Sequence, residues 1–457
     1  MKLSRRTILQ GAGSLPFAIA SLRTGAWAQS APAAALPSDP PPPILFVHGN
    51  GDYDALWMTT LWRMESNGIA HDRMMAINFT DPNARTDDKV EQANRSSTED
   101  QRRELAAAIA ELKRRTGASR VALVGSSRGG YAIRNVIKSG GAGDVSHAVL
   151  CGTPNHGVFA TDDQPNNEFN GRGTFLRGLN EGESEVTPGV AFLTLRSDGM
   201  DKYAQADGRF IGKPGTPTGV TNEGPELKGA TNLVLGALDH REVAFHPRAF
   251  REIYKFIAGR EPDRISIKPE AKVTLSGLVT GTPGGVPTNR PVAGATVEIF
   301  RTSEDGFRKG DGLHKSQTGA DGRWGPVQVD PTWTLEFVLT APDAPITHIY
   351  RSPFPRSSDL VHLRPARPLG PADAKAHAVA IMSRPRGYLG LPRDVVLFGG
   401  EEPKDVKPGV PTDSVTTVRR YSIDSFGSIV AQFNEERVGA RLWPAEQNRI
   451  AIAELTY

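Results

Sequence analysis

The chain has 457 residues, of which 38% are hydrophobic and 23% charged, and its formal charge is +3 at pH 7. This length exceeds what one ordinary hydrophobic core accommodates, so we expect two or three domains. The positive charge comes from the first 28 residues, which hold four basic side chains and no acidic one. The remainder has 50 Lys and Arg against 51 Asp and Glu. Without its first 28 residues the chain is therefore nearly neutral, which argues against a nucleic-acid partner.

Residues 1–28 are typical of an export signal. Arg5 and Arg6 precede a mildly apolar run, and Ala26-Trp27-Ala28 gives the small-x-small pattern of a cleavage site. The segment resembles a twin-arginine signal peptide, which implies a periplasmic or secreted protein that folds before export. A retained anchor is the alternative, but Pro16 and Arg23 interrupt the short apolar run. No other segment approaches the length of a transmembrane helix, so we expect no transmembrane anchor.

Residues 29–41 form a Pro/Ala-rich linker, after which short apolar runs alternate with helical patterns. Continuously apolar runs are typical of parallel strands that helices bury on both faces. The sequence therefore predicts an α/β fold, a parallel sheet with helices on both faces, over residues 42–262. The predicted strands are 44–49, 73–79, 120–125, 147–153, 191–197 and 232–238; helices are predicted over 54–64, 97–117 and 131–141 and from 247 onward.

Beyond residue 262 the pattern changes to strand-like runs separated by Gly, Pro and Asp turns, without helical periodicity between them. We expect a small antiparallel β-sandwich over residues 268–366 and a further C-terminal β domain over residues 367–457.

A tight strand-to-helix turn is predicted at Gly125-Ser126-Ser127-Arg128-Gly129, which fits the pattern G-x-S-x-G. Serine is a poor nucleophile unless it is exposed beside a base, and such a turn lifts it to a pocket mouth. The turn also requires small residues two positions before and after the serine, and both are glycine here. We predict Ser127 as a nucleophile. A merely tight or phosphate-binding turn is the alternative, but the lysine and spacing of a P-loop are missing.

The base is expected between the last strand and the last helix, because the chain order in this architecture is nucleophile, acid, histidine. His240 and His246 lie there. His240 follows the apolar run directly, at the edge of the sheet where ligands bind, whereas His246 precedes Pro247 and fits a helix start. We favour His240. His48 is expected to shape the turn after the first strand, and His147 to be exposed.

The acid must hold the histidine in one tautomer and stabilise the imidazolium. Asp198 and Asp201 both follow the preceding strand. Asp198 stands beside Gly199 and fits a turn, so we favour Asp201 and keep Asp198 as the alternative. Asp239 is too near His240 in sequence to reach around its ring.

Two backbone amides are expected to form an oxyanion hole. We predict the amide of Arg128, directly after the nucleophile, and the amide of Asn50, in the HGNGD turn after the first strand. A Gly-rich turn without chemistry is the alternative for Asn50.

These motifs resemble those of an α/β-hydrolase, and more narrowly the bacterial lipases and esterases of the Bacillus lipase and lipase class 2 group. The matching pieces are ILFVHGNG, VALVGSSRGG, CGTPNHG, FLRGLNEG, VAFLTLRSDGMD and GALDHREVAFHPRAFREIYKFI. The resemblance covers about half of the chain. It implies a triad of Ser127, Asp201 and His240, an oxyanion hole at Asn50 and Arg128, and hydrolysis of carboxylic esters.

Residues 268–366 resemble a transthyretin-like or carboxypeptidase-regulatory β-sandwich, through VTLSGLVTG, PVAGATVEIF and GADGRWGP. With the further β domain, the chain is similar in architecture to archaeal lipases that carry a C-terminal β domain.

Two features depart from the lipase pattern. Arg128 stands where these lipases usually carry an apolar or small residue, which implies a more polar site mouth and counts against a long-chain triglyceride preference. The insertion at 158–189 is a candidate lid, but its acidic, Asn/Gly-rich composition is more typical of a solvated loop.

We expect no metal and no cofactor. The ten histidines lack paired ligand spacing, and Cys151, the single cysteine, offers nothing for zinc and cannot form an internal disulfide. Asp162 and Asp163 are candidate calcium ligands by composition alone, without further support.

The leading hypothesis is an exported serine esterase, whose partners are an ester substrate and a lipid or polymer surface in contact with the β domains. A second is an extracellular polyester depolymerase whose β domains hold the polymer; deletion of residues 268–457 then spares turnover of soluble esters. A third is a non-catalytic binding module on a hydrolase fold. Triad geometry alone does not separate esters from amides.

Overall fold

The computed structural model describes residues 40–204, 226–409, 414–422 and 427–457. The predicted signal peptide and all but the last two residues of the predicted linker lie outside the described residues.

The N-terminal half of the described chain contains a six-stranded parallel sheet in the order β2-β1-β3-β4-β5-β6. Alternate residues of a strand enter different hydrophobic clusters: Ile44 and Phe46 belong to one, Leu45 and Val47 to the other. The sheet is therefore buried on both faces, as the sequence predicts. Its strands are β1 (Ile44–Val47), β2 (Met74–Ile77), β3 (Val121–Ser126), β4 (Val145–Cys151), β5 (Ala191–Arg196) and β6 (Thr231–Val234).

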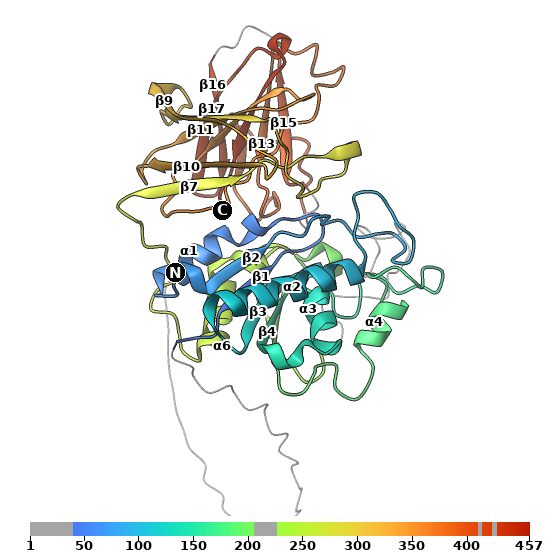
Figure 1. Ribbon diagram of the computed structural model, residues 1–457. Helices are drawn as coiled ribbons and strands as arrows, with labels where there is room; N and C mark the ends of the chain where they lie inside the picture. Colours follow the sequence, from blue (N-terminus) through green and yellow to red (C-terminus); the bar gives the residue numbers. More distant parts are fainter. Residues whose placement is uncertain (1–39, 205–225, 410–413, 423–426) are drawn as a thin grey trace, which may run out of the picture. The chain divides into compact units, whose positions relative to one another are not determined.

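Helices cover both faces of this sheet (Figure 1). α2 (Thr98–Thr116) and α3 (Arg128–Lys138) bury their apolar residues in one cluster, and α1 (Met58–Ser66) and α6 (Pro247–Ala258) in the other. The predicted ends of α2 are confirmed: Ser97 accepts from the amide of Asp100 in a capping box, and Gly117 ends the helix at φ 68°. Two short helices, α4 (Thr174–Leu179) and α5 (Glu242–Phe245), lie in loops beyond the strand ends.

The C-terminal half of the described chain is all β apart from short 3-10 turns. It has a seven-stranded sheet in the order β15-β13-β18-β12-β11-β8-β9, a three-stranded sheet β14-β16-β17 and the pair β10-β7. The strands are β7 (Val273–Leu278), β8 (Thr296–Thr302), β9 (Arg308–Gln317), β10 (Arg323–Val329), β11 (Leu335–Thr340), β12 (Ile346–Arg351), β13 (Ala378–Ser383), β14 (Val396–Phe398), β15 (Thr416–Tyr421), β16 (Ser428–Phe433), β17 (Glu436–Arg441) and β18 (Arg449–Glu454).

The two β segments that the sequence separated at residue 366 share the seven-stranded sheet. β18 pairs in parallel with β12 on one side and with β13 on the other. The sheet is therefore mixed rather than purely antiparallel, because the last strand of the chain inserts between two earlier strands.

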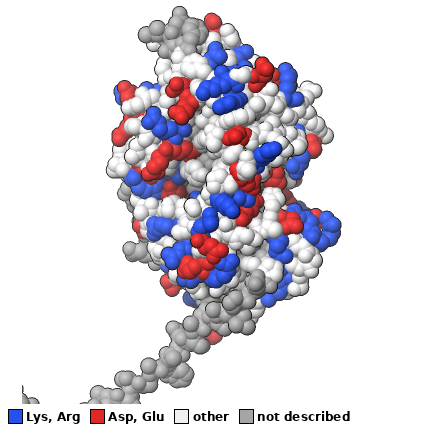
Figure 2. Space-filling view, turned by 90° about the vertical axis from the view of Figure 1, so that its left-hand side faces the viewer, with Lys and Arg blue, Asp and Glu red and all other residues white. Residues whose placement is uncertain are grey.

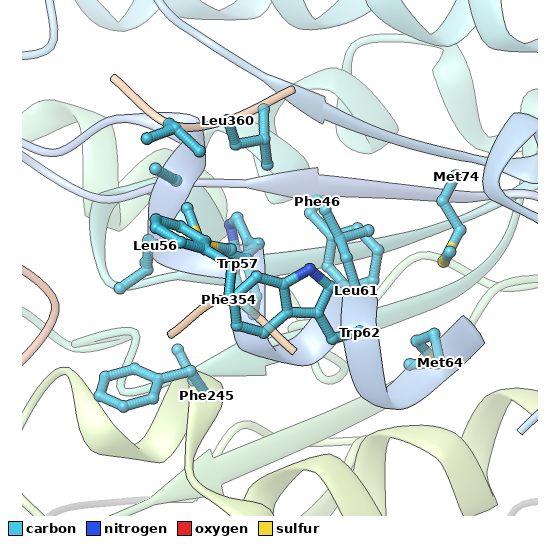
Figure 3. Packing of buried hydrophobic residues seen from close by; sticks show 14 of the residues in the cluster. Phe46, Leu56, Trp57, Leu61, Trp62, Met64, Met74, Phe245, Phe354 and Leu360 are labelled. Atoms are coloured by element: carbon cyan, nitrogen blue, oxygen red, sulfur yellow. The ribbon is translucent and has the colours of Figure 1, made fainter. Parts of the chain in front are cut away.

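One hydrophobic cluster contains residues of both the α/β region and the segment 273–363. Figure 3 shows Phe354 and Leu360 among the side chains around Trp57 and Trp62. The rings of Trp62 and Phe354 meet edge to face with centroids 6.2 Å apart, and the indole nitrogen of Trp62 donates to the carbonyl of Ser357 at 2.9 Å. The β segment therefore contributes to the packing around α1.

On the face drawn in Figure 2, basic and acidic side chains are interspersed. No helix within the described ranges is both long and apolar enough to cross a membrane.

Candidate active site

The predicted elbow lies between β3 and α3, and Ser127 has φ 50° and ψ −120°. A non-glycine residue with positive φ is strained and must be held by its surroundings. Close packing explains the flanking glycines: a Cβ on Gly125 would lie 2.9 Å from the carbonyl carbon of Gly129, and a Cβ on Gly129 would lie 2.6 Å from the carbonyl oxygens of Val47 and His48. The backbone of the elbow therefore packs directly against the end of β1.

The three side chains that the sequence assigns to the triad lie together. The hydroxyl of Ser127 donates to Nε2 of His240 at 2.9 Å, and Nδ1 of His240 lies 3.0 Å from both carboxylate oxygens of Asp201. Both His240 and Asp201 are buried, and the ring of Tyr203 meets the imidazole edge to face at 4.4 Å. This arrangement makes Nδ1 a donor to the carboxylate and leaves Nε2 to accept the serine proton.

The alternative acids and base have other partners. Asp198 accepts from the amides of Met200 and Ala237, at 3.0 and 2.8 Å, as a turn former does. His246 caps α6 by accepting from the amide of Arg248 at 3.2 Å, and burial, followed by nearby arginines, lowers its pKa to about 4. Asp239 instead pairs with arginines of the C-terminal half, described below.

His48 has the structural role that the sequence predicts. Its Nε2 accepts from the amide of Phe79 at 3.1 Å, so Nδ1 carries the proton and donates to the carbonyl of Gly49 at 2.9 Å. Burial lowers the pKa of His48, which keeps the ring neutral.

The prediction that His147 is exposed was wrong. The residue is 6% exposed on β4, and Phe256 of α6 covers its ring edge to face at 5.5 Å. Burial, with Arg120 nearby, lowers the pKa of His147 to about 4.

The turn that carries Asn50 lies beside the nucleophile. A Cβ on Gly49 would lie 3.1 Å from Cβ of Ser127, and the side-chain oxygen of Asn50 fixes the turn by accepting from the amide of Ala84 at 2.8 Å. Arg128 is the first residue of α3, so its amide has no acceptor within that helix. Both predicted oxyanion donors therefore come from segments that meet at Ser127.

The side chain of Arg128 does not make the site mouth polar, contrary to the expectation from sequence. It is fully buried and donates through Nε to Glu168 at 2.6 Å and through its terminal nitrogens to Pro82 and Ser96 at 2.8 to 3.1 Å. Burial raises the pKa of Glu168 to about 7, although Arg128 opposes the shift. Glu168 belongs to the insertion at 158–189, which gives part of that insertion a structural role under the elbow.

A cavity of about 310 Å³ opens above the triad. Val158, Phe159 and Phe169 make part of its wall apolar, and these residues also come from the insertion. Tyr388, from the C-terminal half, was not found by sequence reasoning, since no local motif marks it. The lining consists of Asn50, Asp52, Ser126, Ser127, Pro154, Val158, Phe159, Asn167, Phe169, Tyr203, His240, Arg241 and Tyr388.

Within the part of the chain that the structure describes, no group of three or more His, Cys, Asp or Glu side chains is arranged to hold a metal ion. Cys151 is buried at the end of β4, and burial raises the pKa of its thiol.

Two family models match parts of the chain. The palmitoyl protein thioesterase model matches residues 43–188, and the lipase C-terminal domain model matches residues 271–368. None of the curated proteins compared with the chain matches it.

The similar solved structures include lipase B of Aspergillus fumigatus (15% identity, TM-score 0.35), lipase BlEst2 of Bacillus licheniformis (18%, 0.33) and carboxylesterase CesB of Bacillus subtilis (14%, 0.27). Each similarity covers 49% of this chain, and respectively 54%, 94% and 86% of the other. This chain thus spans about half the length of the Aspergillus lipase.

The chain contains an α/β-hydrolase domain of the lipase/esterase type, followed by a β-rich lipase C-terminal domain. The lipase C-terminal domain model covers most of the segment 268–366, for which the sequence predicts a β-sandwich. None of these matches tests the transthyretin-like resemblance of that segment.

Proposed function

We propose that this protein is an exported serine esterase that cleaves carboxylic esters through an acyl-enzyme. The observation that carries the proposal is the hydrogen-bonded series from Asp201 through His240 to Ser127 at the floor of a cavity. Three such groups in this order activate a serine hydroxyl in otherwise unrelated folds.

In the first half-reaction, Oγ of Ser127 attacks the ester carbonyl carbon while Nε2 of His240 takes the hydroxyl proton. The amides of Asn50 and Arg128 stabilise the oxyanion of the tetrahedral intermediate. His240 then donates its proton to the departing alcohol oxygen as the ester C–O bond breaks.

In the second half-reaction, Nε2 of His240 takes a proton from water as the water oxygen attacks the acyl carbon. His240 then returns that proton to Oγ of Ser127 as the acyl C–O bond breaks and the carboxylic acid leaves. Asp201 accepts from Nδ1 throughout, so that one tautomer faces the serine and the imidazolium is stabilised when it forms.

Replacement of Ser127 tests the proposal. Ser127→Ala should abolish turnover of p-nitrophenyl acetate with an unchanged circular dichroism spectrum, whereas Ser126→Ala, one position away, should keep most of it. A fluorophosphonate probe should label the wild-type protein and the Ser126 variant only. Unchanged turnover in Ser127→Ala, or no labelling of the wild type, would overturn the proposal in favour of a non-catalytic module.

A thioester is a second candidate substrate, because the matching model of residues 43–188 is that of palmitoyl protein thioesterases. An oxoester and a thioester with the same acyl group would give the same acyl-enzyme but different leaving groups. Comparison of their kcat/KM values at two acyl lengths decides between them; a clear preference for the oxoester at both lengths removes the second candidate.

The export part of the proposal rests on the sequence of residues 1–28. Replacement of Arg5 and Arg6 by lysine should leave the protein in the cytoplasm of a bacterial host that carries the twin-arginine pathway. Fractionation and immunoblotting measure this, and unchanged export of the variant would contradict it.

A further inference from the structure

Two buried carboxylates flank the proposed catalytic histidine. Asp239 is 0% and Glu242 6% exposed. Both bind arginines that stand more than 140 positions later in the chain. Arg384 lies 3.2 Å from Asp239 and 2.7 Å from Glu242, and Arg393 lies 2.7 Å from Glu242. With Asp394, which lies 2.7 Å from Arg393, three carboxylates and two guanidinium groups form one largely buried cluster.

The same carboxylates organise the backbone of the histidine loop. One oxygen of Asp239 accepts from the amides of Arg241 and Glu242, at 2.8 and 2.9 Å, and so folds the chain around His240. The other oxygen accepts from Arg384 and from the amide of Tyr388 at 3.0 Å. Burial raises the pKa of Asp239, but the two arginines outweigh it and hold this pKa below its usual value. Asp239 is therefore an ionised bridge between the loop and residues 384–388.

This cluster also fixes a wall of the substrate cavity. Arg384 donates to the carbonyl of Tyr388 at 2.5 Å, and Gly387 packs so closely on the guanidinium of Arg384 that a Cβ there would collide with it. Arg241, next to His240, donates to the carbonyl of Pro385 at 2.8 Å and lies 5.3 Å from the centre of the Tyr388 ring. Tyr388 lines the cavity together with Ser127 and His240.

We propose that residues 384–393 contribute to the active site in two ways. Arg384 is a positioning residue that holds His240 in place through Asp239 and Glu242. Tyr388 forms a wall of the cavity and determines acyl-chain specificity. This inference rests on the proposed esterase function. A buried ion cluster that only stabilised the fold would not need to contact the loop of His240 or to hold Tyr388, a cavity-lining residue, in place.

The specificity of Tyr388 is tested with p-nitrophenyl esters from acetate to octanoate. Tyr388→Ala enlarges the cavity, so the ratio of kcat/KM for octanoate to that for acetate should rise by about tenfold, on the scale that a few methylene contacts give. Tyr388→Phe keeps the ring and should keep the wild-type ratio. An unchanged ratio in Tyr388→Ala would overturn the specificity role.

The positioning role of Arg384 is tested by a split between kcat and KM. Arg384→Met should lower kcat by about 10- to 100-fold with KM changed less than about twofold, because a small misplacement of the base reduces the chemical step. Arg384→Lys should recover part of the loss. The control is Arg419→Met, which breaks an ion pair of 2.7 Å with Glu401 in the same half of the chain and should leave kcat unchanged.

Loss of Arg384 leaves uncompensated buried charge and can prevent folding. The double variant Arg384→Met/Glu242→Gln removes one charge of each sign, and it should fold and still show the lowered kcat. A folded single or double variant with wild-type kcat overturns the positioning role. If Ser127→Ala remains active, the esterase proposal itself fails; if Ser127→Ala is inactive and Arg384→Met is normal, only this inference fails.

Discussion

The nucleophile elbow and the histidine loop, residues 237–246, are built in different ways. The elbow lies between a buried strand and a buried helix that are adjacent in sequence, and its glycines at 125 and 129 permit its close approaches. The histidine loop has only the four-residue helix α5 of its own, and its buried carboxylates are held by Arg384 and Arg393. A short motif can thus specify the nucleophile, whereas the position of the base depends on arginines that are distant in the sequence.

This difference bears on the role of the C-terminal half. If that half only held a polymer, removal of residues 268–457 would spare soluble esters. Because Phe354 packs on Trp62 and Arg384 pairs with Asp239, we expect the deletion to abolish turnover of p-nitrophenyl acetate as well. Wild-type turnover by the shortened chain would show that the histidine loop is as self-contained as the elbow.

After Ser127→Ala, the largest effect of a single substitution is expected at Asp201, the partner of the base. Asp201→Asn should lower kcat by about 10⁴-fold, because the amide favours the wrong tautomer of His240. Asp198→Asn should lower it less than about tenfold, since Asp198 accepts from the amides of Met200 and Ala237 rather than from His240. Both values come from p-nitrophenyl acetate turnover. Equal losses in the two variants would contradict the assignment of Asp201.

The sequence predicted those parts of the molecule that local chemistry determines. Continuously apolar runs identified all six strands of the parallel sheet, and Ser97 and Gly117 marked the ends of α2. The G-x-S-x-G motif and the order of strand ends led to Ser127, His240 and either Asp198 or Asp201. The fold brings Ser127, His240 and the favoured Asp201 within hydrogen-bond distance. Their catalytic role stays a prediction until the substitutions are made.

What the sequence could not predict depends on contacts between distant segments. The side chain of Arg128 turns inward because Glu168, 40 positions later, receives it, and His147 is buried because Phe256 covers it. The place of β13 beside β18 depends on the last strand of the chain. Tyr388 carries no motif, and only the fold places it at the cavity.

A substitution within the elbow gives the next effect. In Gly129→Ala the new methyl group would meet the carbonyl oxygens of Val47 and His48 at 2.6 Å, and backbone atoms of β1 cannot yield as a side chain tip can. We expect a loss of about 1–3 kcal/mol in the free energy of unfolding and about 100-fold in kcat. Gly143→Ala is the control, because a Cβ there meets nothing within 4 Å. Urea unfolding and turnover measure both effects. A harmless Gly129→Ala would show that packing against the end of β1 does not constrain the elbow.

The smallest effect concerns the contact between Arg128 of the elbow and Glu168 of the insertion. Because burial raises the pKa of Glu168 to about 7, the folded protein keeps a proton there between about pH 4.5 and 7 that the unfolded chain has lost. The contribution of Glu168 to stability therefore falls as the pH rises through this window, by about 1–3 kcal/mol.

The amide in Glu168→Gln has no such proton to lose. The free energy of unfolding of this variant, relative to that of the wild type, should therefore increase as the pH rises from 5 to 8, while kcat changes little. Urea unfolding of both proteins at the two pH values measures the difference. A constant difference would mean that Glu168 is ionised throughout as the partner of Arg128. In that case the elbow, like the histidine loop, would be held by a buried ion pair with a residue distant in sequence. The two regions would then differ only in their backbone packing.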